Sequence, residues 1–217
     1  PVEARLPSTG SGNDLNSYSF FKITMRLPPD LLLSAYSQGW FPMAHEDGEL
    51  YWHDPDPRTI IPLPDFHVPR SLKRALKKNR FVVRTNTAFA AVLAGCAAAT
   101  PGREDTWINE DIVAAYTRLY QLGYAHSVET WRDGSLVGGL YGVALGGLFA
   151  GESMFSRETD ASKVALVYLV EHLKSRGFLL LDVQYMTDHL RRFGAVEIPA
   201  KAYKARLQVA LRLPVSF

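Results

Sequence analysis

The sequence contains a single cysteine among 217 residues. One cysteine cannot form an intramolecular disulfide or supply the several thiolates of a cysteine-based zinc site. Cys96 stands in the run AAVLAGCAAA, where small apolar neighbours favour a buried structural role over that of a nucleophile. The sequence therefore predicts neither an internal disulfide nor a zinc–thiolate centre.

Long apolar runs and an excess of one charge are also missing. No stretch approaches the ~20 apolar residues of a membrane-spanning helix, and no signal-peptide pattern stands at the start. The net charge is only +2, so any nucleic-acid contact must come from a local basic patch. The six histidines show neither HxxxH nor HExxH spacing. We expect a cytoplasmic protein without membrane contact, metal or other cofactor.

The length suits one large domain or two small ones. Residues 1–19 are polar and rich in Ser, Gly and Asn, which predicts a flexible extension. For residues 20–105 the sequence predicts a small α+β domain, in which short strands alternate with helices. Its expected helices are 31–38, 71–79 with Ser71 as N-cap, and 87–99, and its expected strands are 50–52 and 81–84.

Residues 106–217 are more regular. Asn109 is the expected N-cap of a helix that Gly123 ends. Three strands follow at 125–132, 136–143 and 148–155, joined by the turns Asp133-Gly134 and Gly146-Gly147. A helix opened by Asp160 or Ser162, a central strand at 178–183 buried on both faces and a helix at 188–193 complete the region. An antiparallel meander, a helix and a parallel return strand predict a mixed α/β sheet, in an order that resembles the acetyltransferase-type (GNAT-like) fold.

The segment Leu136–Lys163 carries six glycines between residues 136 and 151, followed at once by Glu152. Glycine is used where backbone must turn or be approached closely. An acid between such glycines and Met154-Phe155 indicates a lined pocket. A glycine-rich hairpin with a solvated acid explains the segment equally well, and the segment alone leaves both interpretations open.

Asp182 and Gln184 share one face of the expected central strand, because side chains alternate along a strand. A carboxylate at the end of a buried strand is costly unless it is paired or hydrogen-bonded. Asp182 either ties down a neighbouring loop or lies in a cleft at the carboxyl end of the strand, where open α/β sheets bind ligands. With Glu152 from the adjacent strand, such a cleft would suit a positively charged substrate such as an N-terminal amine.

Other side chains have both structural and functional interpretations. Apolar side chains that could line a pocket, although each is also typical of core, are Leu140, Phe149, Met154 and Phe155. Trp52 and Trp107 stand beside irregular backbone, where an aromatic ring either stacks on a base or bridges two regions. A basic helix face that is either solvated or bound to phosphates comprises Lys73, Arg74, Lys77 and Lys78. Ser153 lies in GESM, which is not the GxSxG elbow of serine hydrolases.

Five separated motifs in one order give the sequence a resemblance to a known family. They are WHDPDPR at 52–58, TWI at 106–108, YAHSVETW at 124–131, GESMFSRETDASK at 151–163 and LLLDVQ at 179–184. Together they resemble the bacterial leucyl/phenylalanyl-tRNA–protein transferases across about residues 34–207. The resemblance implies a GNAT-like fold for the C-terminal part. It also implies transfer of leucine or phenylalanine from Leu-tRNA or Phe-tRNA to proteins that begin with arginine or lysine, which marks them for N-end-rule degradation.

The resemblance also suggests roles for the candidate residues. Asp182 would polarise Gln184 and accept or relay a proton, while Glu152 would position an amine. Trp107 would stack on the terminal adenosine, with Trp52 at the mouth of the cleft. The side-chain pocket and its surroundings would comprise Leu140, Phe149, Met154, Phe155 and Ser153, and the tRNA would contact Lys73, Arg74, Lys77 and Lys78. We expect the protein to act as a monomer.

Three other functions remain possible on the same fold. An acetyl-CoA-dependent acetyltransferase needs a glycine-rich (Q/R)xxGx(G/A) loop near residue 162, where this sequence reads SRETDASK. A non-enzymatic tRNA-binding module would not need the pair Asp182 and Gln184, and a turnover assay would separate it. An enzyme that adds amino acids from tRNA to cell-wall precursors would differ in its acceptor.

Overall fold

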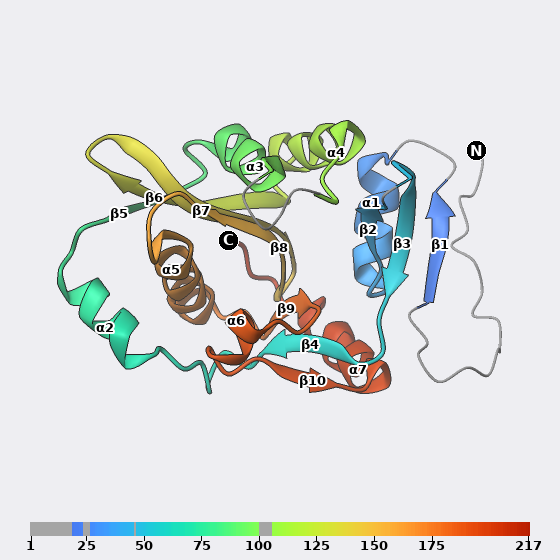
Figure 1. Ribbon diagram of the computed structural model, residues 1–217. Coiled ribbons are helices and arrows are strands. Elements are labelled where there is room, and N and C mark those ends of the chain that lie inside the picture. The colour runs from blue at the N-terminus through green and yellow to red at the C-terminus, as the bar shows by residue number, and fades with distance from the viewer. Residues whose placement is uncertain (1–18, 24–26, 46, 100–105) are drawn as a thin grey trace.

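The computed structural model describes residues 19–23, 27–45, 47–99 and 106–217 (Figure 1). The expected flexible extension therefore lies outside the described residues, apart from Ser19 at its boundary. Two β-sheets organise the described part of the chain, one with three strands and one with seven. Among the described residues, none of the helices combines the length and the apolar character needed to cross a bilayer.

The small sheet comes from the N-terminal part of the chain. Its strands are β1 (Ser19–Ile23), β2 (Phe41–Ala44) and β3 (Leu50–Asp54), in the antiparallel order β1-β3-β2. Helix α1 (Pro29–Ser37) packs against β2 and against the helix α4 (Glu110–Gln121) of the larger unit. The small sheet and α1 thus share one apolar cluster with the rest of the protein.

The large sheet has the order β10-β4-β9-β8-β7-β6-β5. Its strands are β4 (Arg58–Ile61), β5 (Val82–Thr85), β6 (Ala125–Arg132), β7 (Ser135–Leu145), β8 (Leu148–Ser156), β9 (Leu180–Gln184) and β10 (Val196–Ile198). Strands β8 and β9 pair in parallel, and the other described pairs are antiparallel. The meander β6-β7-β8, the helix and the parallel return strand β9 confirm the expected mixed sheet of GNAT-like type.

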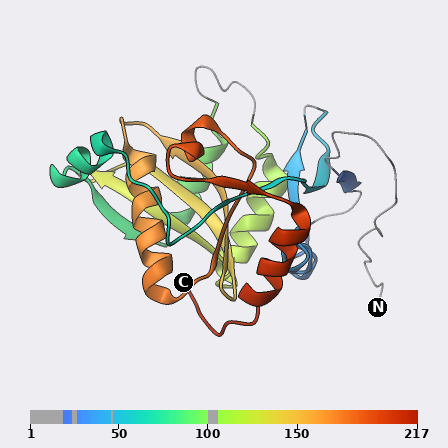
Figure 2. The same ribbon diagram turned by 90° about the horizontal axis from the view of Figure 1, so that it is seen from below.

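Helices cover both faces of this sheet. Helices α3 (Phe89–Ala97) and α4 lie on one face and α5 (Ala161–Arg176) on the other, with α2 (Arg70–Lys77) packed beside α5 (Figure 1). Figure 2, seen from below, has α5 and α7 (Ala200–Ala210) in front and α4 behind. The side chains of β7 explain the two layers, because Tyr141 joins the cluster of α3 and α4 while Leu140 joins that of α5. The short helix α6 (Asp188–Arg191) follows β9.

The division between the two sheets falls earlier than the boundary expected near residue 105. Strands β4 and β5 precede that residue and yet belong to the large sheet. Strand β4 escaped prediction because its four residues are all buried, so the alternation that marks a half-exposed strand is missing. Strands β1, β2 and β10 and helix α7 were not predicted either.

The expected helix caps have mixed outcomes. The Asn109 side chain accepts a hydrogen bond from the amide of Ile112, so this cap is confirmed, and Thr187 caps α6 in the same way. The expected cap at Ser71 is wrong, since α2 begins one residue earlier, after Pro69, without a side-chain cap bond. Pro69, at the N-cap position, has no side-chain atom that could accept a hydrogen bond from the helix amides.

Glycines allow β7 and β8 to approach their neighbours closely. A Cβ on Gly142 would lie 2.3 Å from the carbonyl oxygen of Ala150 and 2.4 Å from the ring of Phe149. A Cβ on Gly151, the partner of Gly142 across the two strands, would find its nearest atom at 3.6 Å. A side chain is therefore excluded at Gly142 but has room at Gly151, although both residues lie in strands.

We predict that Gly142→Ala lowers the free energy of unfolding by about 1–3 kcal/mol, because the added methyl group must displace backbone and a packed ring. Gly151→Ala is the matched control and should change it by less than about 0.5 kcal/mol. Urea unfolding of both variants measures the difference. Equal losses in the two variants would contradict the close approach at Gly142.

Candidate functional site

A cavity of about 300 Å³ opens where the parallel strands β8 and β9 separate. Their pairing ends at Ala150 and Asp182, and beyond this point β8 continues alongside β7 alone. The cavity is lined by Phe41, Met43, Trp107, Leu140, Tyr141, Gly151, Glu152, Ser153, Met154, Leu166, Leu169, Leu181, Val183, Gln184, Tyr185, Thr187, His189 and Leu190. It lies at the carboxyl end of β9, as expected for a ligand site in an open α/β sheet.

Six of the residues expected at the site line this cavity. They are Trp107, Leu140, Glu152, Ser153, Met154 and Gln184. Trp52, Phe149 and Phe155 are instead buried in the apolar clusters that support it. Trp52 was expected there because it stands beside irregular backbone, and Phe149 and Phe155 because they are apolar and close to Glu152 in sequence. Neither feature indicates how deeply neighbouring elements cover a side chain.

Asp182 lies beneath the cavity and is fully buried. Its carboxylate accepts two hydrogen bonds from Arg58, from Nε at 2.9 Å and from Nη2 at 2.6 Å, and a third from the hydroxyl of Tyr203 at 2.8 Å. The Asp182 carboxylate raises the pKa of Arg58 despite its burial, so the guanidinium stays charged. The sequence left two interpretations of Asp182 open. Its contacts agree with the first, in which the carboxylate holds neighbouring elements together, and not with the second, in which it lies inside the cleft.

Gln184 is positioned by the same carboxylate. Its backbone amide donates to Oδ1 of Asp182 at 3.0 Å, and its φ of +60° is in the left-handed region that residues other than glycine rarely adopt. This turn at the end of β9 aims the side chain at the cavity, where its Nε2 donates to Glu152 at 3.3 Å. Asp182 thus holds the backbone of Gln184 and not its side chain.

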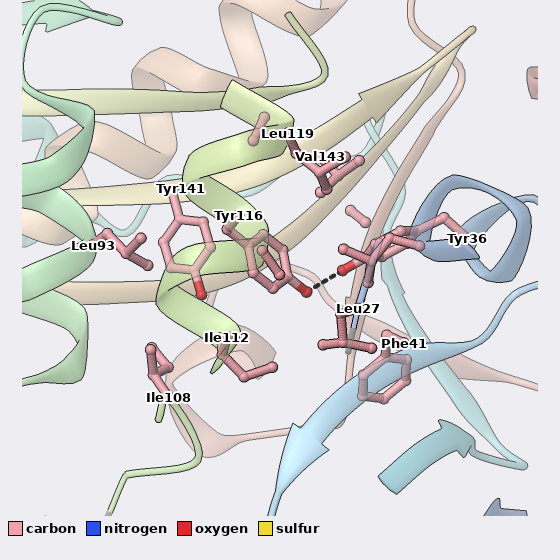
Figure 3. Packing of buried hydrophobic residues seen from close by; sticks show 14 of the residues in the cluster. Leu27, Tyr36, Phe41, Leu93, Ile108, Ile112, Tyr116, Leu119, Tyr141 and Val143 are labelled. Atoms are coloured by element: carbon pink, nitrogen blue, oxygen red, sulfur yellow. Dashed lines mark hydrogen bonds between the residues drawn. The ribbon is translucent and has the colours of Figure 1, made fainter. Parts of the chain in front are cut away.

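Glu152 binds two tyrosines that sequence reasoning did not assign to the site. The hydroxyl of Tyr36, from α1, lies 2.7 Å from Oε1, and that of Tyr116, from α4, lies 3.0 Å from Oε2. The two hydroxyls also hydrogen-bond to each other, as Figure 3 shows. Both tyrosines have pKa values well above the ordinary one because of burial and the neighbouring Glu152.

The three contacts among these groups need three protons. Each tyrosine hydroxyl supplies one, so an ionised Glu152 leaves one contact without a proton, whereas a protonated Glu152 completes the ring. Burial raises the pKa of Glu152 to about 7, although the bonds from Tyr36 and Tyr116 oppose the rise. Glu152 faces the cavity but is enclosed by protein, and both arguments indicate a carboxyl group that carries its proton up to about neutral pH.

A second polar array lies at the edge of the cavity. His53 is hydrogen-bonded to Tyr185 through Nδ1 and to His45 through Nε2, at 3.0 Å in each case. Burial and the neighbouring His45 lower the pKa of His53 to about 4, so this imidazole is neutral at pH 7. The array ties His53 of β3 to His45, which follows β2, and to Tyr185, which follows β9.

The basic helix face lies apart from this cavity. The side chains of Lys73, Arg74, Lys77 and Lys78 are exposed on α2, which packs on α5 away from β9. Sequence reasoning also missed Arg58, although it stands in a quoted motif, because no periodicity marks an arginine that is buried beside an acid distant in sequence. Within the described ranges, no group of His, Cys, Asp or Glu side chains could hold a metal ion.

Comparisons with known proteins agree with the motifs. The model of the leucyl/phenylalanyl-tRNA protein transferase family matches residues 60–208, and the model of its N-terminal domain matches residues 25–56. This chain belongs to that family. The N-terminal match ends at residue 56, between β3 and β4, and the other begins at residue 60 within β4, so the matches change close to where the two sheets divide. The resemblance that the sequence carried is thereby confirmed.

Two relatives show how much of the family's length the chain shares. The leucyl/phenylalanyl-tRNA–protein transferase of Paramagnetospirillum magneticum is 57% identical over 187 residues, which cover 85% of this chain and 90% of the relative. That of Gloeobacter violaceus is 53% identical over 192 residues, which cover 88% and 97%.

Solved structures give more distant similarities. A ribosomal-protein-alanine N-acetyltransferase from Brucella melitensis biovar Abortus is 20% identical, with a TM-score of 0.35 over 52% of this chain and 86% of that one. L-PGS from Bacillus licheniformis is 13% identical, with a TM-score of 0.42 over 79% and 57%.

We predict that Asp182→Asn lowers the free energy of unfolding by about 3–5 kcal/mol, because the change leaves the buried guanidinium of Arg58 without its counter-charge. Tyr203→Phe is the control, since it removes one donor to the same carboxylate and should cost only about 1.5–3 kcal/mol. Urea unfolding at pH 7 measures both variants. The prediction fails if Asp182→Asn costs no more than Tyr203→Phe.

The protonation of Glu152 predicts a pH-dependent stability. Between an unfolded pKa near 4.5 and a folded pKa of about 7, the native carboxyl holds a proton that the unfolded chain releases, so stability falls as pH rises through this window. Glu152→Gln keeps a neutral group that can both donate and accept, and it removes the titration.

We therefore expect the stability of the native protein relative to Glu152→Gln to be lower at pH 8 than at pH 5. Urea unfolding at the two pH values gives this difference, and all other titrating groups cancel in it. A difference that stays constant or grows with pH would show that Glu152 is ionised throughout the window.

Proposed function

We propose that the protein transfers leucine or phenylalanine from aminoacyl-tRNA to the α-amine of a protein that begins with arginine or lysine, and so marks that protein for N-end-rule degradation. The observation that carries the proposal is the composition of the cavity at β9. Gln184, Glu152 and Trp107 meet there with an apolar wall in a space of about 300 Å³. A polar edge beside an apolar wall suits an aminoacyl ester, which has a reactive carbonyl and a hydrocarbon side chain.

The reaction needs positioning more than chemical activation. The amine nitrogen attacks the ester carbonyl, the new C–N bond forms as the C–O bond to the ribose breaks, and the proton that the amine loses ends on the ribose oxygen. An ester is already activated, and an α-amine has a pKa of only about 8. Holding the two reactants in contact therefore supplies much of the rate enhancement.

The apolar wall is the proposed pocket for the transferred side chain. Its members come from β7, β8, α5 and the segment after β9, and they are Leu140, Met154, Leu166, Leu169 and Leu190. Leucine and phenylalanine are unbranched at Cβ, so their bulk starts one carbon away from the ester. Valine and isoleucine branch next to the backbone, where the reacting groups must meet.

Gln184 is the proposed contact of the attacking amine. Its amide nitrogen is bonded to Glu152, which leaves its carbonyl oxygen to accept a hydrogen bond from the amine. Asp182 acts in this proposal as a positioning residue and not as the proton acceptor, because its oxygens are bonded to Arg58, Tyr203 and the backbone of Gln184. Trp107 lines the cavity and is the proposed stacking surface for the terminal adenine.

The decisive experiment is the transfer of radiolabelled leucine from Leu-tRNA to two peptides, one beginning with Arg and one with Asp. We expect label on the Arg peptide alone. Label on the Asp peptide would keep the chemistry and overturn the acceptor. Label on neither peptide would reject the proposed function and favour a binding module.

Gln184→Ala is the matched variant for this assay. Alanine tolerates the left-handed backbone no worse than glutamine, so the fold should persist while label transfer falls by at least about tenfold. Circular dichroism checks the fold. Unchanged transfer would remove Gln184 from the reaction.

A further inference from the structure

Strand β9 ends in a tight turn that is centred on Gln184. The amide of Tyr185 donates to the carbonyl of Val183 at 2.7 Å, and Gln184 between them has a φ of +60°. A three-residue turn with a positive φ at its centre is the rare and strained form of the γ-turn. A residue other than glycine keeps such a conformation only where the surrounding structure holds it. The turn that aims Gln184 at the cavity therefore needs support from both sides.

The support before the turn comes from Asp182. Its Oδ1 accepts a hydrogen bond from the amide of Gln184, and Arg58 and Tyr203 hold the same carboxylate. These contacts fix the nitrogen of Gln184, but none of them involves the residue that closes the turn. The position of Tyr185 depends instead on contacts that its own side chain makes.

Tyr185 packs against the small sheet. Its ring lies edge-on to that of Phe41 in β2, with 5.8 Å between the ring centres, and to that of His53 in β3, with 6.4 Å between them. Its hydroxyl is hydrogen-bonded to Nδ1 of His53 at 3.0 Å. Either tautomer of His53 forms this bond, because a hydroxyl can both donate and accept. The residue that closes the turn is thus bound to strands that lie far from it in sequence.

His53 provides a fixed end for this contact. It is buried, its ring stacks on Phe41 at 5.7 Å, and its Nε2 is hydrogen-bonded to His45 at 3.0 Å. The ring of Phe41 lies in turn against the guanidinium of Arg58, which is 4.7 Å from the ring centre. Because Arg58 also binds Asp182, the supports on the two sides of the turn meet at this arginine.

Building on the proposed function, we propose that Tyr185 and His53 are positioning residues, whose hydrogen bond holds the turn so that the side-chain carbonyl of Gln184 faces the attacking amine. A displaced Tyr185 would rotate the turn, and with it the Gln184 side chain that is bonded to Glu152. The small sheet thereby contributes to the reaction through the geometry of Gln184, without any contact to the amine.

Direct contact with the substrate is the competing role for Tyr185, since this residue also lines the cavity at β9. Its hydroxyl is engaged with His53, which favours support of the turn. The two roles differ in their dependence on Gln184. A residue that acts through Gln184 has no effect on the rate once that side chain is removed, whereas a substrate contact keeps its effect.

The first test is Tyr185→Phe, which keeps the ring and removes the hydroxyl. We expect kcat for leucine transfer to the Arg peptide to fall about five- to tenfold, while KM for Leu-tRNA stays within about twofold. Tyr120→Phe is the matched control, because the hydroxyl of Tyr120 donates to the carbonyl of Asn86 and the residue does not line the cavity. It should leave both constants unchanged. An unchanged kcat in Tyr185→Phe would overturn the proposal.

The second test repeats Tyr185→Phe in the Gln184→Ala variant, with single-turnover rates to measure the residual transfer. We expect the added change to have no further effect, because Tyr185 acts through the side chain that is already missing. An equal fall in both backgrounds would assign Tyr185 to the substrate or to the fold at large, and would contradict a role through Gln184.

The two ring nitrogens of His53 allow a matched pair of variants. His53→Asn places an amide group where Nδ1 stands and keeps the bond to Tyr185, whereas His53→Gln places it near Nε2 and keeps only the bond to His45. Both variants lose the ring that stacks on Phe41. We expect kcat to be about fivefold higher in His53→Asn than in His53→Gln. Equal values would show that the bond at Nδ1 does not position Gln184.

Hydrogen exchange tests the support of the turn without any transfer reaction. The amide of Tyr185 closes the turn, so its exchange, followed by NMR, should be about five- to tenfold faster in Tyr185→Phe and in His53→Gln, and unchanged in Tyr120→Phe. Exchange as slow as in the native protein in all three variants would reject the support. No transfer by the native protein to either peptide would reject the proposed function, and the exchange rates would still decide whether the pair holds the turn.

Discussion

The buried ion pair of Arg58 and Asp182 is the interaction on which the site depends. Burying two charges is expensive and is tolerated only where the pair is bidentate and its remaining hydrogen-bonding groups are satisfied. Both conditions hold, because Arg58 also donates to the carbonyl of Gly39 and lies between the rings of Phe41 and Tyr203. One arginine thereby joins the small sheet, the end of β9 and α7, and fixes where β9 ends.

The end of β9 in turn decides what the cavity contains. Asp182 holds the backbone of Gln184 in a left-handed turn, and the side chain of Gln184 reaches Glu152 on the strand that has diverged from β9. Glu152 is bonded in addition to Tyr36 of α1, so the small N-terminal unit contacts the reaction site at two points. Its sheet and helix are therefore part of the site, and Phe41 and Met43 supply some of its wall.

Sequence patterns predicted those parts of the structure that follow local rules. Alternation and turn signals located the meander from β6 to β8, and the polar residues of β8 and β9 identified Glu152 and Gln184. Contacts between distant elements left no such signal. Tyr36 follows the helical spacing of a core residue, and only the approach of α1 to α4 brings its hydroxyl to Glu152. The depth at which Phe149 lies depends likewise on α5 and the C-terminal residues that cover it.

The charges around the cavity at β9 suit a reaction that needs a neutral amine. Beneath the cavity at β9 the charge of Asp182 is balanced by Arg58, and Glu152, which lines the cavity, keeps its proton up to about pH 7, so the cavity has little net charge. An ammonium ion loses solvation in such a place and gains no counter-charge, which lowers its pKa and favours the free amine that attacks the ester.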